Sequence, residues 1–207
     1  MEAGPLSPPD ALRGLAEIAN RDDALKARTE GLTWVLWGFV NLGVAMTYLA
    51  LLPEEAFLGA PDLASPAVLL VGLYPLTGIL ATVGLWRSAA LSFPTGMSFR
   101  RGLLFFTAFL VIVTVLSLGF LPFVGWEQGV LGKSVAVGLF LLGFGALNPL
   151  GFTRSGRGSA FALGAIALLG GAAGLAAGLT GTASVLLATG TLGWAWVAVG
   201  LWALYHG

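Results

Sequence analysis

The sequence contains no cysteine and only one histidine. Without cysteine the chain has no disulfides, no thiolate catalysis, no iron–sulfur cluster and no covalently attached c-type haem. A metal site usually draws on several histidine or cysteine ligands, and a serine hydrolase needs a buried base. His206, next to the end of the sequence, provides neither on its own. We therefore expect no catalytic residues, no metal ligands and no cofactors, and we interpret the protein as a non-enzyme.

Charged residues are also scarce, at 10% of the 207 residues, whereas 57% are hydrophobic. Soluble domains usually carry about 25% charged residues. Six apolar runs of about 20 residues are each long enough to cross a bilayer core of ~30 Å. They are Leu32–Leu52, Pro66–Trp86, Gly102–Leu121, Ser134–Phe152, Ser159–Leu179 and Ala183–Tyr205. The composition predicts an all-α, polytopic membrane protein with six transmembrane helices.

None of these runs contains an aspartate, glutamate, arginine or histidine. An ionisable residue within a membrane span is by default a functional candidate. The membrane core therefore lacks the residues for a carboxylate proton relay, an ion-pair gate or a carboxylate cation site.

The basic residues fall almost entirely on one side of the predicted membrane. Nine of the ten lie before the first run, between the second and third, or between the fourth and fifth, and only Lys133 falls on the other side. By the positive-inside rule, both termini are cytoplasmic. The sequence has no concentrated basic patch of the kind that binds nucleic acids, so we expect no nucleic-acid partner.

Residues 1–30 form a charged segment, which we predict to be cytoplasmic, helical and amphipathic, followed by a transmembrane domain at 31–207. Ser7 and Asn20 have the form of two helix caps, so we expect two short helical pieces. Leu12, Leu15 and Ile18 share one side of the first piece. This side either lies in the lipid headgroups or packs against the protein's own loops or a partner.

The six runs resemble three helical hairpins of one design. Leu51-Leu52-Pro53 matches Phe120-Leu121-Pro122, and Trp86-Arg87-Ser88 matches Thr153-Arg154-Ser155. Each unit contains two spans, so every unit begins on the same side of the membrane. The repeated units therefore share one orientation, which makes this a parallel rather than an inverted repeat. We expect the first two hairpins to superpose, with Pro53 over Pro122 and Arg87 over Arg154.

These landmarks, with glycine-rich spans throughout residues 31–206, resemble the HdeD-like family of small bacterial and archaeal membrane proteins. The resemblance implies a stress-linked protein of a prokaryotic plasma membrane, without a catalytic site. The chain departs from the family in its longer charged amino-terminal segment and its longer first outer loop, Pro53–Ser65.

Neutral polar residues lie within the spans, and Asn41 is near the middle of the first. An amide in hydrocarbon needs a hydrogen-bond partner, for which we consider Tyr74, Thr77 and Thr82, or Thr107 and Thr114. One interpretation is a structural bond between helices. The other is a small polar pocket formed by Asn41, Tyr74, Pro75 and Thr77.

Three further patterns concern packing. Gly170, Gly174 and Gly178, spaced four apart, predict a close helix contact within the chain or with another protomer. The segment Arg154–Ser159 is interpreted as a basic loop at the inner surface. Tryptophans near the cytoplasmic ends of the runs are interpreted as interface anchors, namely Trp34, Trp37, Trp86 and Trp202.

The function that these features favour is a non-catalytic integral membrane protein: a scaffold, an accessory subunit or a stress-associated factor. Its partners would be the lipid bilayer and a membrane protein or a second copy. The alternative is a channel or carrier for a small neutral or lipophilic solute, centred on the polar pocket.

Overall fold

The computed structural model describes residues 8–51, 66–92, 111, 128–147 and 153–206. Within these ranges every regular element is a helix. The elements are α1 (Pro8–Leu51), α2 (Pro66–Ser92), α4 (Gly129–Leu147), α5 (Arg154–Ala176), α6 (Gly181–Val185), the π-helical turn η2 (Leu186–Thr191) and α7 (Leu192–His206). The prediction of an all-helical fold is confirmed for this part of the chain.

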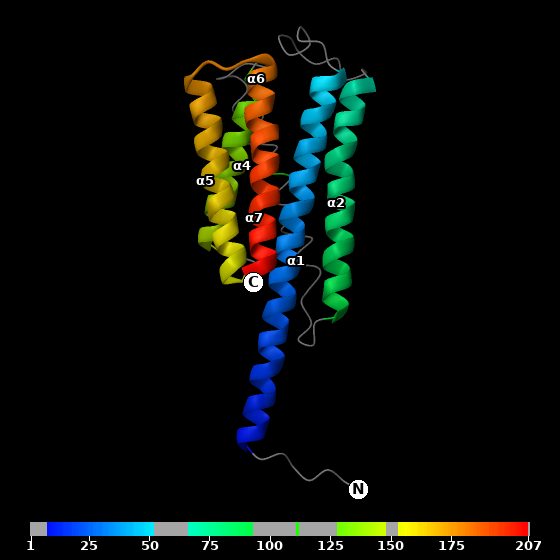
Figure 1. Cartoon of the computed structure of the whole chain (residues 1–207), viewed down its shortest axis with the longest axis vertical. Coiled ribbons are helices and arrows are strands. Elements are labelled where there is room, and N and C mark those ends of the chain that lie inside the picture. Colours follow the sequence, from blue (N-terminus) through cyan, green and yellow to red (C-terminus); the bar gives the residue numbers. More distant parts are fainter. Residues whose placement is uncertain (1–7, 52–65, 93–110, 112–127, 148–152, 207) are drawn as a thin grey trace.

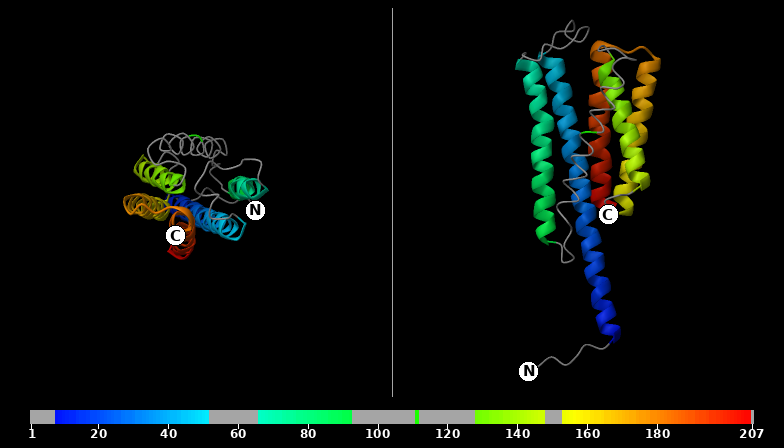
Figure 2. Two further views of the ribbon diagram at one scale, coloured as in Figure 1. Left: turned by 90° about the horizontal axis from the view of Figure 1, so that it is seen from above. Right: turned by 180° about the vertical axis from the view of Figure 1, so that it is seen from behind.

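The helices run roughly along one axis, with α1 and α2 beside a group formed by α4, α5 and α7 (Figure 1). Seen from above, α1 lies between α2 and this group, and α7 packs on α1 (Figure 2). The fold is therefore a bundle in which α1 contacts both parts.

Three of the described helical segments are long and apolar enough to cross a membrane: Gly129–Leu147, Arg154–Ala176 and Gly181–His206. Large apolar side chains also face outward along the bundle, where Leu80 is 64% exposed, Leu169 68% and Trp194 65%. Exposed apolar surface of this extent suits contact with lipid rather than water. These observations indicate an integral membrane protein.

The amino-terminal segment differs from the prediction of two short pieces, because α1 is one continuous helix of 44 residues. No proline interrupts the sequence between Pro9 and Pro53, so the cap signal at Asn20 does not end the helix. The amino-terminal part of α1 continues beyond the ends of α5 and α7 (Figure 1).

Glycines set the distance between α1 and α7. A Cβ on Gly38 would lie 2.9 Å from the carbonyl oxygen of Gly193, and a Cβ on Gly193 would lie 3.1 Å from that of Gly38. Seven residues away on each helix, Gly31 and Gly200 face each other in the same manner, at 3.0 and 2.8 Å. Two antiparallel helices thus touch backbone to backbone at two points two turns apart.

A second pair, α4 and α5, meets in the same way. Gly138 and Gly164 face each other, at 2.8 and 3.1 Å from added Cβ to carbonyl oxygen. Seven residues beyond Gly164, a Cβ on Gly171 would lie 2.9 Å from the carbonyl oxygen of Leu131. Ser134 adds a bond between the helices, donating its hydroxyl to the Ala167 carbonyl at 3.0 Å.

The contact predicted for Gly170, Gly174 and Gly178 is therefore wrong in part. Only Gly174 is buried against neighbours, and a Cβ on Gly170 would meet nothing within 4 Å. Gly178 lies after α5, at φ 65°, where Gly178 N–H and Leu179 N–H donate to the carbonyls of Leu175 and Gly174. This is a Schellman ending, which favours glycine at the left-handed position.

The predicted hairpins are not the packing units of the described bundle. The most extensive contacts join α4 with α5 and α1 with α7, which pairs spans from different predicted hairpins. The close glycine contacts explain this pairing, since the connections between spans do not decide which backbones can approach. Pro53, Pro122 and all but Val111 of the third predicted span lie outside the described residues.

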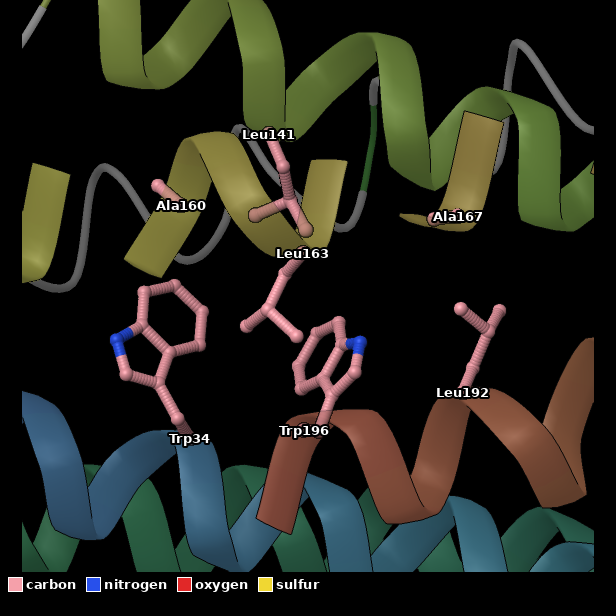
Figure 3. Close-up of a cluster of buried hydrophobic side chains, with 7 residues drawn as sticks. All are labelled: Trp34, Leu141, Ala160, Leu163, Ala167, Leu192 and Trp196. Carbon is pink, nitrogen blue, oxygen red and sulfur yellow. The ribbon is translucent and has the colours of Figure 1, made fainter. Parts of the chain in front are cut away.

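The two helix pairs meet in a core of buried apolar side chains. In Figure 3, Trp34 from α1 and Trp196 from α7 face Leu163 from α5. The two indole rings are 5.7 Å apart between centroids and meet edge to face. Trp34 is only 7% exposed, so its interpretation as an interface anchor is wrong, whereas Trp202 is 49% exposed.

Three side-chain hydrogen bonds join α2 to α1. Trp37 Nε1 donates to Thr82 Oγ1 at 3.1 Å, and Trp86 Nε1 donates to Thr33 Oγ1 at 3.0 Å. Further along, the Thr47 hydroxyl donates to the Tyr74 hydroxyl at 3.2 Å. The indole N–H groups of Trp37 and Trp86 thus bind the neighbouring helix.

We predict that Gly138→Ala destabilises the protein by about 1–3 kcal/mol, because the new methyl would lie 2.5 Å from Leu168 N and would push α5 away. Gly143→Ala, on the same helix, is the matched control, since its Cβ would meet nothing within 4 Å. Unfolding of both variants in detergent measures the difference. Equal stability of the two variants would contradict the close contact of α4 and α5.

Candidate functional site

The least expected feature of the structure is a buried carboxyl group at one end of the bundle. Glu30 lies in α1, two residues before the first apolar run, and is 1% exposed. Buried carboxyl groups are rare unless they are paired or hydrogen-bonded. A stable structure therefore requires hydrogen-bond partners for the Glu30 carboxyl group.

Its partners come from the start of α5, 123 residues further along the chain. Thr153 N–H donates to Glu30 Oε1 at 3.2 Å, and the Thr153 hydroxyl is 2.5 Å from Oε2. That hydroxyl also accepts a bond from Gly156 N–H at 3.1 Å and is 3.1 Å from the Ser155 hydroxyl. Both carboxyl oxygens are thus bonded, within a short chain of hydroxyl groups.

These contacts explain why α5 begins at Arg154, where a basic loop was predicted. Thr153 is the N-cap, accepting a bond from the third residue of the helix. The first N–H groups of a helix have no partners inside it, and a carboxylate nearby is favoured by the helix dipole. The loop prediction for Arg154–Ser159 is therefore wrong: these residues form the first turns of α5, although serine and glycine are weak helix formers.

Gly156 makes room for the carboxyl group. A Cβ on Gly156 would lie 2.6 Å from Glu30 Cδ, so no larger residue fits without movement. One residue later, Arg157 points elsewhere and donates from Nε to the Gly145 carbonyl at 3.2 Å, which ties α5 to the end of α4. The Arg157 side chain is thus engaged with backbone rather than with Glu30.

Burial raises the pKa of Glu30 to about 7 from its usual value of 4.5, because the charged form loses hydration. The side-chain and backbone bonds from Thr153 and the positive charge of Lys26 oppose this increase in pKa, and the negative charge of Asp23 adds to it. Glu30 thus titrates close to neutral pH. Chemically, the site offers proton uptake and release and the capping of a helix.

The four polar-pocket residues predicted from the sequence lie away from Glu30. Asn41 is in α1, and Tyr74, Pro75 and Thr77 are in α2. Asn41 is half-buried and donates from Nδ2 to the Trp37 carbonyl of its own helix at 2.8 Å. The Tyr74 ring fills the space beside Gly43, where a Cβ would lie 2.5 Å from the ring. Thr77 is exposed and donates to the Tyr74 carbonyl at 2.8 Å.

Pro75 is half-buried inside α2, which continues through it. Of the four predicted residues, hydrogen bonding thus links Tyr74 and Thr77 along one turn of α2, while the amide donor of Asn41 is satisfied within α1. A polar pocket formed by the four residues together stays a prediction.

Sequence reasoning missed Glu30 because it appears as the last charge of a charged segment. One signal was present: the carboxyl group immediately precedes Gly31 and the apolar run, where a helix enters a low-dielectric environment. Its partner at Thr153 carries no sequence signal that connects it to residue 30. Comparisons with protein-family models, curated proteins and solved structures gave no match to this chain.

We predict that Gly156→Ala destabilises the start of α5, because the methyl would displace the Glu30 carboxyl group from Thr153. The expected loss is about 1–3 kcal/mol, the usual cost of overpacking. Gly158→Ala is the control, since its Cβ would meet nothing within 4 Å.

Amide hydrogen exchange in the first two turns of α5 measures the effect in both variants. Faster exchange in Gly156→Ala alone is the expected result. Similar exchange in the two variants would show that the carboxyl group does not occupy this space.

Proposed function

We propose that this protein is a non-catalytic integral membrane protein that serves as a scaffold or accessory subunit. The observation that carries the proposal is the dual role of α1. Its carboxy-terminal half is fixed in the bundle by glycine contacts with α7, and its amino-terminal half extends past the other helices (Figure 1). Such a helix can hold a partner at a fixed distance from the membrane.

The extended part of α1 carries a stripe of exposed apolar side chains. Leu12 is 68% exposed, Leu15 64% and Ile18 44%. Because α1 continues along the axis of the bundle, the part of the helix that carries this stripe extends away from a membrane that surrounds the bundle (Figure 1). The direction of the helix favours a protein partner over the alternative that the segment lies in the headgroups.

A topology of six spans with cytoplasmic termini is part of the proposal. The support is that α1 and α2 each contain about 20 residues without a charge, Leu32–Leu51 and Pro66–Trp86, beside the three spanning segments. The third run, Gly102–Leu121, is the sixth candidate. The distribution of basic residues supports the orientation.

The packing between α1 and α2 supports a structural rather than a transport role for the polar residues there. The Thr47, Tyr74 and Thr82 hydroxyl groups bond across the two helices, and the Tyr74 ring fills the space beside Gly43. The stress-linked role implied by the resemblance to the HdeD-like family is an extension of this proposal.

The orientation predicts a specific labelling pattern in this cysteine-free chain. Thr180→Cys, at the exposed turn between α5 and α6, should react with an impermeant thiol reagent in intact cells. Gly158→Cys, at the opposite end of α5, should react only after permeabilisation. Reaction at position 158 and protection at position 180 in intact cells would reverse the proposed topology.

A photo-crosslinking amino acid tests the scaffold role. Placed at position 15, within the exposed apolar stripe, it should form an adduct with a protein in cells, and placed at Glu17, on the opposite side of the same helix, it should not. Mass spectrometry identifies the adducts. Lipid adducts at position 15 would instead support a helix in the headgroups and contradict the proposed arm.

A further inference from the structure

We propose that Glu30, Thr153 and Ser155 form a proton-binding site at the junction of α1 and α5, in which the carboxyl group holds the proton and the two hydroxyl groups connect it to solvent. This inference does not rest on the scaffold function proposed above. It begins with geometry: a carboxyl group that is 1% exposed, bonded to Thr153 through both oxygens, at the end of the bundle rather than within its apolar length.

The hydrogen bonds around Glu30 suit both of its protonation states. In the ionised state, the Thr153 hydroxyl donates to Glu30 Oε2 and the Ser155 hydroxyl donates to Thr153 Oγ1. In the neutral state, Glu30 donates from Oε2 to Thr153 Oγ1, and Thr153 donates to Ser155. Gly156 N–H donates to Thr153 Oγ1 in either state, because a hydroxyl oxygen can accept two bonds.

The same chain of groups gives the proton a route. When solvent protonates Ser155, the Ser155 hydroxyl proton passes to Thr153 and the Thr153 hydroxyl proton passes to Glu30. Ser155 keeps the proton from solvent, so each hydroxyl ends with one proton and the carboxylate gains one. Ser155 is half-buried, which brings the outer end of the chain to the surface. Release of the proton follows the reverse order.

The charged groups near the site come from few elements. On α1, Lys26 favours the ionised carboxylate and Asp23 disfavours it. On α5, Arg154 is exposed, and Arg157 is exposed and bonded to the Gly145 carbonyl. The charged residue of α4, Lys133, lies at the other end of that helix, and His206 of α7 is bonded to the Trp202 carbonyl.

The pKa of about 7 sets the direction of the pH dependence. Between the usual pKa of 4.5 and pH 7, the folded protein holds more protons than the unfolded chain, so stability falls as the pH rises through this window. Above pH 7 both states are ionised and the contribution of Glu30 is constant. Glu30→Gln remains neutral at every pH and removes this dependence.

The test uses the full-length protein in lipid nanodiscs and infrared spectroscopy of the carbonyl band of a protonated carboxylic acid, from pH 5 to pH 9. The expected result is a band that disappears with a midpoint near pH 7. It should be absent in Glu30→Gln and unchanged in Glu17→Gln, whose parent residue is exposed on the same helix. A band that persists in Glu30→Gln, or no band above pH 6 in the parent protein, would overturn the proposal.

Thr153→Val keeps Glu30 and removes the hydroxyl group that stabilises the ionised form. The midpoint should rise by roughly one pH unit or more, the usual effect of a lost bond to a charged group. An unchanged midpoint would overturn the role of Thr153. This variant also keeps the proposal testable if Glu30→Gln does not fold, since the absence of the band above pH 6 in both the parent protein and Thr153→Val would reject the site.

Discussion

The structure depends on how closely pairs of helix backbones can approach. In a membrane, the lipid tails are as apolar as leucine, so helices associate through van der Waals packing and hydrogen bonds rather than through the hydrophobic effect. The glycine contacts of α1 with α7 and of α4 with α5 bring carbonyl oxygens to about 3 Å from the position of a missing Cβ. Because the contacts recur after seven residues, or two helical turns, each pair stays aligned as well as close.

The two pairs are joined in different ways along their length. Within the apolar part, Trp34, Trp196 and Leu163 form a common core. At the end of the bundle, Glu30 of α1 bonds to Thr153 at the start of α5, which belongs to the other pair. The first contact is insensitive to pH, whereas the second contains a group that titrates near neutrality. A change of charge at Glu30 therefore acts on the relation between the pairs and leaves the contacts within each pair intact.

Much of the helical content could be predicted from apolar run length alone, and α2 begins at the predicted Pro66. Two of the errors share one physical origin, because local patterns do not report distant partners. Arg154–Ser159 has loop composition, but Thr153 and a carboxyl group 123 residues away allow it to be helical. The four-residue spacing that begins at Gly170 predicted the wrong contact face of α5. The glycines that contact α4 are Gly164 and Gly171, seven residues apart, and the sequence of α5 alone does not show which glycines meet a partner helix. For Asn41 the sequence analysis considered partners on other helices, but its amide donates to the Trp37 carbonyl of its own helix.

The central claim is that the paired backbones of α1 and α7 touch at glycines. Solid-state nuclear magnetic resonance of the protein in lipid, with carbon-13 in glycine only, tests it directly, because correlations between glycines of different helices require close backbones. We expect cross-peaks between Gly38 and Gly193 and between Gly31 and Gly200. The adjacent residues Gly170 and Gly171 supply a reference cross-peak in the same spectrum. A spectrum that shows the reference but neither of the two interhelical cross-peaks would contradict the account.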